Sequence, residues 1–285
     1  MSERELILEV RDLSVEFTLP GGSLFGPKKI LRAVKEVSFD LYEGETLGIV
    51  GESGSGKSTL ARAIVRLVQP SGGESVWLGR DIQKMSSKEL LALRKDIQMV
   101  FQDPLASLNP RMTAGAIIAE PLLTHEPDVG KAERTIRVAA MMEKVGLSPT
   151  MINRYPHEFS GGQCQRIGIA RALITNPKLV ICDEAVSALD VSIRAQVINL
   201  LMDLQKELGI SMLFISHDIA VVRHIAQRVL VMYLGEVVEI GGAAQVVEHP
   251  RHDYTKKLIA AVPVPDPKVE MQRREDRRQM RRAAA

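Results

Sequence analysis

Along this chain, short apolar runs of strand length alternate with stretches in which hydrophobic residues recur at helical spacing. This alternation predicts alternating strands and helices. Short apolar runs of strand length occur in the main part of the chain at residues 45–50, 96–101, 179–184 and 210–215. Apolar residues recur at helical spacing after several of these runs, at residues 60–68, 167–173 and 193–208. Strands that alternate with helices in this way predict an α/β fold.

Other parts of the chain depart from this alternation. Short stretches rich in β-forming residues predict strands at 7–10, 14–17, 37–41 and 74–78, a hairpin at 228–233 and 236–240, and a Pro- and Gly-rich loop at 19–27. Residues 111–158 have helical spacing alone, at 114–119 and 132–145, which predicts a helical insertion.

These changes of pattern give the expected domain organisation. We expect one large unit at residues 1–245 with a helical subdomain at about 103–171 inserted in it, followed by an extension at 246–267. Residues 268–285 form a basic tail with arginine pairs four residues apart, which favours a flexible end over a helix that contacts lipid or a partner.

Residues 51–58, Gly-Glu-Ser-Gly-Ser-Gly-Lys-Ser, match the phosphate-loop pattern G-x-x-x-x-G-K-[ST] in full. A predicted strand precedes them and a predicted helix follows, so backbone N–H groups and a helix N-terminus can surround a polyphosphate. Lys57 would reach the phosphates and the Ser58 hydroxyl would bind Mg²⁺. The alternative, a Gly- and Ser-rich turn ahead of an ordinary helix, is disfavoured by the strand and helix on either side.

Polar side chains follow three of the predicted strands directly. Gln102 comes after the run at 96–101, Asp183 and Glu184 end the run at 179–184, and His217 follows the run at 210–215. The carboxyl ends of parallel strands meet at one edge of a sheet, where ligands bind. In a chain with a phosphate loop, the adjacent Asp183 and Glu184 favour metal and water handling over a charged turn. A glutamine or a histidine at the end of a strand is usually structural, and Gln102 and His217 become candidates because they share this edge with the phosphate loop.

Two further stretches have both a structural and a functional interpretation. Ser160 is a good helix N-cap, and the two glycines after it expose backbone N–H groups, which is more glycine than a cap requires. Phe17 ends a strand where its ring could stack on a base, although an aromatic residue there is also typical of a core.

Composition narrows the class of protein. The 285 residues include 37 basic and 35 acidic side chains, so a formal net charge of +2 gives no field that points to nucleic acid. No apolar run approaches the ~20 residues of a membrane span, and the charged N-terminus lacks the apolar core of a signal peptide. The two cysteines, Cys164 and Cys182, suit a reducing compartment and lack metal-ligand spacing.

Taken in order, the motifs resemble those of the ATP-binding cassette (ABC) ATPases over residues from about 6 to 245. Residues 51–58 resemble the Walker A loop, Gln102 the Q-loop, residues 159–163 the signature loop and residues 179–184 the Walker B strand. Asp190 and His217 resemble the D-loop and the switch histidine. The resemblance implies a P-loop NTPase fold with an N-terminal antiparallel β part, a mainly parallel RecA-like core sheet, a helical subdomain and a short C-terminal extension.

The resemblance also implies an ATPase that uses Mg²⁺, with a role for each matching residue. The catalytic residues would be Glu184, His217 and Gln102, with Glu184 as the general base. The ATP-binding residues would be Phe17, Gly51, Ser53, Gly54, Ser55, Gly56, Lys57, Ser58 and Thr59. The metal ligands would be Ser58, Gln102 and Asp183. Residues of the signature loop acting on a partner's ATP would be Ser160, Gly161, Gly162 and Gln163, with Asp190 in the D-loop.

Within this family the chain is most similar to the ATPases of oligopeptide and dipeptide importers. The similarity lies in residues 43–57, 100–110 and 186–191, and in the extension at 249–255 and 262–265. It implies a second ABC ATPase subunit, identical or paralogous, two membrane permease subunits and, indirectly, an extracytoplasmic solute-binding protein. It also implies a peripheral position on the cytoplasmic face of the inner membrane, and no nucleic acid as partner. Nickel and glutathione importers share these features, so the cargo stays open.

The chain departs from its family at three points. The extension has no cysteine, so no iron–sulfur cluster is expected; Ala185 stands where proline is usual, and Cys164 where a larger or polar residue is common. A cassette subunit of a carbon–phosphorus lyase complex remains an alternative. A chromosome- or repair-type ATPase has no room here for its coiled coil, and a stand-alone P-loop kinase or GTPase would leave residues 160–163 and His217 unexplained.

Overall fold

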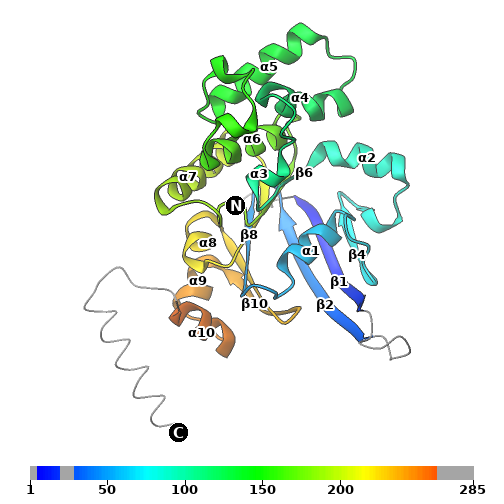
Figure 1. Cartoon of the computed structure of the whole chain (residues 1–285). Helices are drawn as coiled ribbons and strands as arrows, with labels where there is room; N and C mark the ends of the chain where they lie inside the picture. Colours follow the sequence, from blue (N-terminus) through cyan, green and yellow to red (C-terminus); the bar gives the residue numbers. More distant parts are fainter. Residues whose placement is uncertain (1–4, 20–28, 262–285) are drawn as a thin grey trace, which may run out of the picture.

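A six-stranded sheet forms the centre of the computed structural model, which describes residues 5–19 and 29–261 (Figure 1). Its strands lie in the order β10-β9-β3-β8-β7-β6. Their bounds are β3 Thr46–Val50, β6 Ile97–Val100, β7 Leu179–Asp183, β8 Ser211–Ser216, β9 Arg228–Tyr233 and β10 Glu236–Gly242. All neighbours pair in parallel except β9 and β10. Every residue of β3, β7 and β8 is buried, as expected for parallel strands covered on both faces. The predicted α/β fold with a mainly parallel core sheet is confirmed.

The N-terminal part forms a second, antiparallel sheet in the order β2-β1-β4-β5. Its strands are β1 Leu6–Leu19, β2 Lys29–Tyr42, β4 Gly72–Trp77 and β5 Arg80–Asp81. The prediction of separate strands at 7–10 and 14–17 is wrong, because β1 continues through a bulge. Asp12 takes a left-handed φ of 47° there, and its N–H donates to Ser38 Oγ at 2.8 Å. The strand predicted at 37–41 is the end of β2, whose earlier residues pair with β1.

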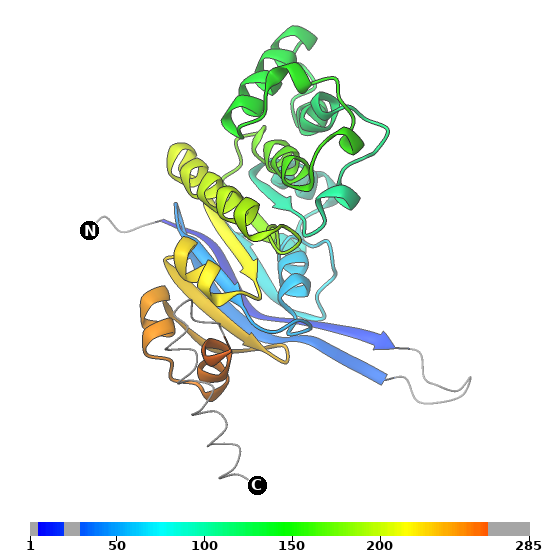
Figure 2. The same ribbon diagram turned by 60° about the vertical axis from the view of Figure 1, so that its left-hand side comes forward.

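Helices cover the central sheet and extend away from it. Their bounds are α1 Lys57–Ile64, α2 Ser87–Asp96, α3 Pro104–Ser107, α4 Ala114–His125, α5 Lys131–Lys144, α6 Gly161–Leu173, α7 Val191–Leu208, α8 Ile219–Ile225, α9 Ala243–Glu248 and α10 Asp253–Ala260, with 3₁₀ turns at Ile82–Lys84, Pro149–Met151 and Pro156–Glu158. The helices α4, α5 and α6 gather at one end of the molecule, and α9 and α10 lie at the other end beside β10 (Figure 1, Figure 2).

Two helices differ from the prediction because of proline. The short helix α3 lies where no separate helix was predicted; Pro104 occupies its first turn, where a missing N–H costs nothing. Helix α4 continues through Pro121 to His125, beyond the predicted end at 119. Pro121 is buried, and the packing of α4 on α5 and α6 offsets the lost backbone hydrogen bond.

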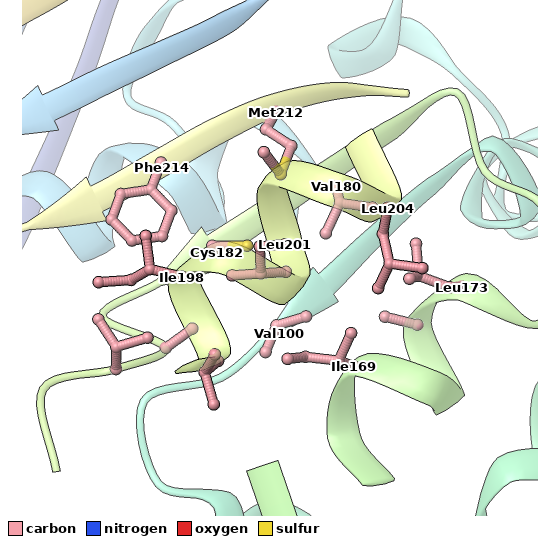
Figure 3. Packing of buried hydrophobic residues seen from close by; sticks show 14 of the residues in the cluster. Val100, Ile169, Leu173, Val180, Cys182, Ile198, Leu201, Leu204, Met212 and Phe214 are labelled. Carbon is pink, nitrogen blue, oxygen red and sulfur yellow. The ribbon is translucent and has the colours of Figure 1, made fainter. Parts of the chain in front are cut away.

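The apolar core lies on both faces of the central sheet. One cluster joins β6, β7 and β8 to α6 and α7, where Phe214, Cys182 and Leu201 are at most 2 % exposed (Figure 3). A second cluster joins the two sheets through α1. This packing fixes the strand ends and the start of α1 relative to one another.

Some predictions fall on residues outside those described, namely most of the loop at 19–27, residues 262–267 of the extension and the basic tail at 268–285. Among the described helices, none combines the length and the apolar character needed to cross a membrane.

Candidate functional site

The phosphate-loop sequence connects the end of β3 to the start of α1. Gly56, with φ of 100°, is the N-cap of α1, and a Cβ there would lie 2.2 Å from the Ala33 carbonyl oxygen. A Cβ on Gly51 would lie 2.2 Å from the carbonyl oxygen of Met232. Both positions therefore require glycine, because the loop is pressed between β2 and the end of β9.

Lys57 lies inside this loop and is only 4 % exposed. Its Nζ donates hydrogen bonds of 2.8 Å to the carbonyl oxygens of both Gly51 and Glu52, and lies 3.4 Å from Ser55 Oγ. Burial lowers the pKa of Lys57, and the carboxylates of Glu184 and Asp183 act in the opposite direction. The loop thus presents a buried cation facing two acids.

Asp183 ends β7 and is fully buried. Its Oδ1 accepts a 2.5 Å hydrogen bond from Ser58 Oγ, and its Oδ2 lies 3.2 Å from Arg62 Nη2. Hydroxyl and carboxylate oxygens are ligands that Mg²⁺ accepts, usually together with substrate phosphates and water. The pair Ser58 and Asp183 therefore fits a magnesium–nucleotide. The part of the chain that the structure describes holds no group of three or more His, Cys, Asp or Glu side chains suited to a metal ion.

Glu184 connects three strand ends. Its N–H donates to the carbonyl oxygen of Ile215 on β8 at 3.1 Å, and its Oε2 accepts from Gln102 Nε2 at 3.2 Å. The same oxygen lies 3.6 Å from His217 Nδ1. The Glu184 side chain is 14 % exposed, whereas that of His217 is 51 % exposed. A carboxylate that is largely shielded yet keeps some exposure can contact a small molecule in the site.

The backbone of Glu184 has a left-handed φ of 50°, which is unusual for a residue with a side chain. The turn that follows is held by Ser187, whose N–H and hydroxyl both bond to the Glu184 carbonyl oxygen, at 3.1 and 2.9 Å. Ala185 is 1 % exposed in this turn. Ser187 therefore holds the carbonyl group of Glu184 in this turn, in which Ala185 stands at position 185.

The signature-loop residues lie at the start of α6. Ser160 is its N-cap, with a reciprocal capping box to Gln163, in which Ser160 N–H donates to Gln163 Oε1 at 2.9 Å. Gly162 has a packing role, since a Cβ there would lie 2.4 Å from Ile193 Cγ2 of α7, whereas a Cβ on Gly161 would meet open space. Ser160 and Gly161 are exposed.

Asp190 and Phe17 lie on other elements than Gln102, Glu184 and His217. Asp190 caps α7, where its Oδ1 accepts from Ile193 N–H at 3.0 Å; this hydrogen bond and that of the Ser192 hydroxyl lower the pKa of Asp190. Phe17 pairs with Leu31 of β2 and is 38 % exposed. Its partner strand reaches the phosphate loop two residues further on, at Ala33.

Two residues that contact this site, Arg62 and Tyr254, were not predicted from the sequence. Arg62 follows Ser58 by four residues, a spacing that places both on one helix face, so periodicity could have indicated it. Tyr254 of α10 accepts a 2.9 Å hydrogen bond from the Glu52 N–H in the phosphate loop. The two residues are 202 positions apart, and no local pattern signals their contact.

A phosphate loop between a buried strand and a helix, beside a strand that ends in two carboxylates, defines a P-loop nucleotide-hydrolysing protein. The sequence matches the family described as ABC transporter over residues 34–187, and the family described as oligopeptide/dipeptide transporter, C-terminal region, over residues 238–284. The chain belongs to the ABC transporter family, and it is an ATPase of the oligopeptide/dipeptide importer type.

Individual relatives agree with this assignment. The chain is 63 % identical to the oligopeptide transport ATP-binding protein OppF of Haemophilus influenzae, over 94 % of this chain and 82 % of that protein. It is 58 % identical to the glutathione import ATP-binding protein GsiA of Shigella flexneri, over 92 % of this chain but only 42 % of that longer protein.

Solved structures give the same fold. The dimeric ATP-binding cassette MJ0796, in a post-hydrolysis state bound to ADP and Pi, superposes with a TM-score of 0.74 at 30 % identity, covering 83 % of this chain and 99 % of that one. The cbiO1 protein of Clostridium perfringens gives a TM-score of 0.75 at 27 % identity, covering 94 % and 98 %.

Proposed function

We propose that this chain is the ATP-hydrolysing subunit of an importer that takes up oligopeptides. The observation that carries the proposal is the similarity to OppF along nearly the whole chain, including the C-terminal region. The relatives reported above are named as transport or import proteins and give no support to the carbon–phosphorus lyase alternative. Glutathione is itself a peptide, so the GsiA relatives favour the same class of cargo.

In the proposed mechanism, Lys57 and the backbone N–H groups of the loop bind the phosphates of ATP, and Phe17 stacks on adenine. Gly51, Ser53, Gly54, Ser55, Gly56 and Thr59 complete the phosphate-binding set. Magnesium, held through Ser58 and Asp183 with Gln102 nearby, would supply charge neutralisation at the phosphates.

Glu184 is the proposed general base, which takes a proton from the attacking water. The proposal is supported by its shielded carboxylate and by the contacts to Gln102 and His217 on either side. These two residues would hold the carboxylate in place and sense or stabilise the terminal phosphate. Phosphoryl transfer depends mainly on such positioning and on charge stabilisation.

In this proposal, the second ATPase subunit contacts this chain at the signature loop. Ser160 and Gly161 are exposed, so they are available to the ATP of a partner subunit, together with Gly162, Gln163 and Asp190. ATP between two cassettes would then hold them together, since a ligand at 100 times its Kd stabilises the bound state by about 2.7 kcal/mol. Hydrolysis would release the pair.

A cleft of about 710 Å³ is the proposed docking site of a membrane permease subunit. It lies between α2 and the helices α3 and α4, and it is lined in part by Leu91 of α2, by Pro121 of α4 and by Gln102. Because Gln102 also contacts Glu184, the cleft and the hydrolysis site share a residue. Docking there would place the chain at the cytoplasmic face of the inner membrane, with a solute-binding protein on the other side.

The experiment that tests this function is affinity purification of the tagged chain from detergent-solubilised membranes of its own organism. Integral membrane subunits should co-purify, and the complex in liposomes should take up a labelled tripeptide only with ATP inside the compartment that holds the cassettes. The same complex carrying Glu184→Gln is the matched control without hydrolysis. Co-purification with a soluble enzyme complex and no permease would contradict the proposal, and uptake of glutathione but of no other peptide would restrict the cargo.

A further inference from the structure

The C-terminal helix α10 contacts the phosphate loop through one side chain. Tyr254, only 8 % exposed, places its hydroxyl 2.9 Å from the Glu52 backbone N–H, which is the donor. Figure 2 shows how α10 lies beside β10, at the end of the molecule opposite the helices α4 and α5. A segment that follows the catalytic residues in sequence is thus bonded to the loop that precedes them.

The bonded N–H belongs to a peptide unit that also binds Lys57. The peptide between Gly51 and Glu52 has its carbonyl oxygen 2.8 Å from Lys57 Nζ, while its N–H points at Tyr254. A peptide unit is planar, so fixing its N–H fixes the direction of its carbonyl oxygen. Hydrogen bonds at both ends of one peptide also polarise and strengthen each other.

Tyr254 is itself held firmly. Its ring packs on that of Tyr233, with centroids 4.2 Å apart and planes tilted by 32°. The N-terminus of α10 is bound to β10, because the Glu239 carboxylate accepts from the N–H groups of Arg251 and His252 at 2.9 and 3.0 Å. Burial raises the pKa of Tyr254, so the hydroxyl keeps its proton at neutral pH and accepts with its lone pair.

We propose that Tyr254 is a positioning residue for ATP binding: its hydroxyl orients the Gly51–Glu52 peptide, and through it the Lys57 ammonium. The proposal rests on the proposed role of Lys57 in binding phosphates, and it is independent of which solute is carried.

The test compares Tyr254→Phe with Tyr233→Phe in the full chain. Tyr254→Phe removes only the hydroxyl and keeps the ring pair, whereas Tyr233→Phe removes the hydroxyl of the other ring and leaves the bond to Glu52 in place. We expect Tyr254→Phe to raise the Kd for ATP about 3- to 10-fold, the range for one lost hydrogen bond, and Tyr233→Phe to leave it unchanged. Calorimetric titration with MgATP measures both, and the Tm of the nucleotide-free variants separates binding from stability.

Each outcome bears on the proposal. A wild-type Kd in Tyr254→Phe, or equal losses in both variants, would overturn it, because the hydroxyl would then have no role of its own. A lower Tm with an unchanged Kd would show that Tyr254 only stabilises α10, and would overturn it too. Lys57→Ala is measured alongside: if that variant binds ATP normally the proposed site fails, whereas its loss of binding beside a normal Tyr254→Phe rejects this inference alone.

Discussion

Ser58 Oγ lies 2.5 Å from Asp183 Oδ1, although 125 positions of sequence separate the two residues. The bond joins the first turn of α1 to the buried end of β7, and so sets the distance between the phosphate loop and the two acids. The other oxygen of Asp183 faces Arg62 from the same helix at 3.2 Å. A fully buried carboxylate is tolerated here because both its oxygens are bonded.

Replacing Arg62 by alanine should therefore destabilise the chain. Asp183 would keep its bond to Ser58 but lose its ion pair with Arg62. We expect the free energy of unfolding to fall by about 1–2 kcal/mol, less than for a fully buried pair because Arg62 is partly exposed. Urea unfolding followed by circular dichroism measures this. Arg80→Ala is the control, since its pair with Glu89 is largely exposed and should change stability by less than about 0.5 kcal/mol.

Glu184→Gln should separate ATP binding from hydrolysis. The amide keeps the size of the side chain but cannot take a proton, so we expect the hydrolysis rate to fall about 10²- to 10⁴-fold while ATP still binds. Release of phosphate and calorimetric titration measure the two properties. Glu207→Gln, on the exposed side of α7, is the control and should hydrolyse ATP at the wild-type rate. Near-normal hydrolysis in Glu184→Gln would mean that another group is the base.

Much of the fold could be predicted because its central strands are buried on both faces. Such strands read as unbroken apolar runs, so β3, β7 and β8 were recognisable, and so was the edge where Asp183, Glu184 and His217 follow them. The structure brings these side chains together, while their roles stay predictions until variants are measured.

The parts that could not be predicted depend on contacts distant in sequence. In the sequence, the residues around Asp12 have the pattern of a strand end, and the bulge there depends on the hydrogen bond of Asp12 to Ser38. Helix α4 continues through Pro121 because other helices pack on it. The bond between Tyr254 and Glu52 joins two segments of ordinary composition. Hydrophobic periodicity carries no information about such pairs.

Cys182 should be almost unreactive in the folded chain. Burial, and then the neighbouring Asp183 carboxylate, raise the pKa of its thiol to about 12. In the unfolded chain the thiol has an ordinary pKa near 8.5, so at pH 8.5 about half is thiolate. We expect alkylation by iodoacetamide at that pH to be at least ~100-fold slower in buffer than in urea, as read by mass spectrometry. Fast labelling of Cys182 in buffer would contradict the buried position.

The same shift has a consequence for stability at high pH. Between about pH 8.5 and 12 the folded chain keeps the Cys182 proton while the unfolded chain loses it. Stability from this group is therefore complete below pH 8.5 and is lost as the pH rises through that window. Cys182→Ala should unfold with a weaker dependence on pH between 8.5 and 10 than the wild-type chain.

Gly162→Ala should destabilise the chain more than Gly161→Ala, although both change a signature-loop glycine. The new Cβ at position 162 would lie 2.4 Å from Ile193 Cγ2, so the Ile193 side chain or the helices α6 and α7 must shift, which costs about 1–3 kcal/mol. Position 161 is open, and alanine there should leave stability unchanged or raise it by up to about 1 kcal/mol. Urea unfolding measures the stability of both variants. Equal losses of stability would show that the contact between Gly162 and Ile193 does not set the cost of the substitution.

Leu91→Glu should disrupt docking without affecting the chain on its own. Leu91 lines the cleft beside α2 and is 46 % exposed, so a carboxylate there can remain hydrated and should cost the isolated chain little stability. In a complex the same carboxylate would be buried against the permease without a partner, which is strongly unfavourable. We expect normal ATP binding but loss of permease subunits on affinity purification. Leu123→Glu, also exposed but outside the residues that line the cleft, is the matched control and should retain them. If Leu91→Glu keeps its membrane subunits and Leu123→Glu loses them, the permease docks on the outer face of α4 instead of in the cleft.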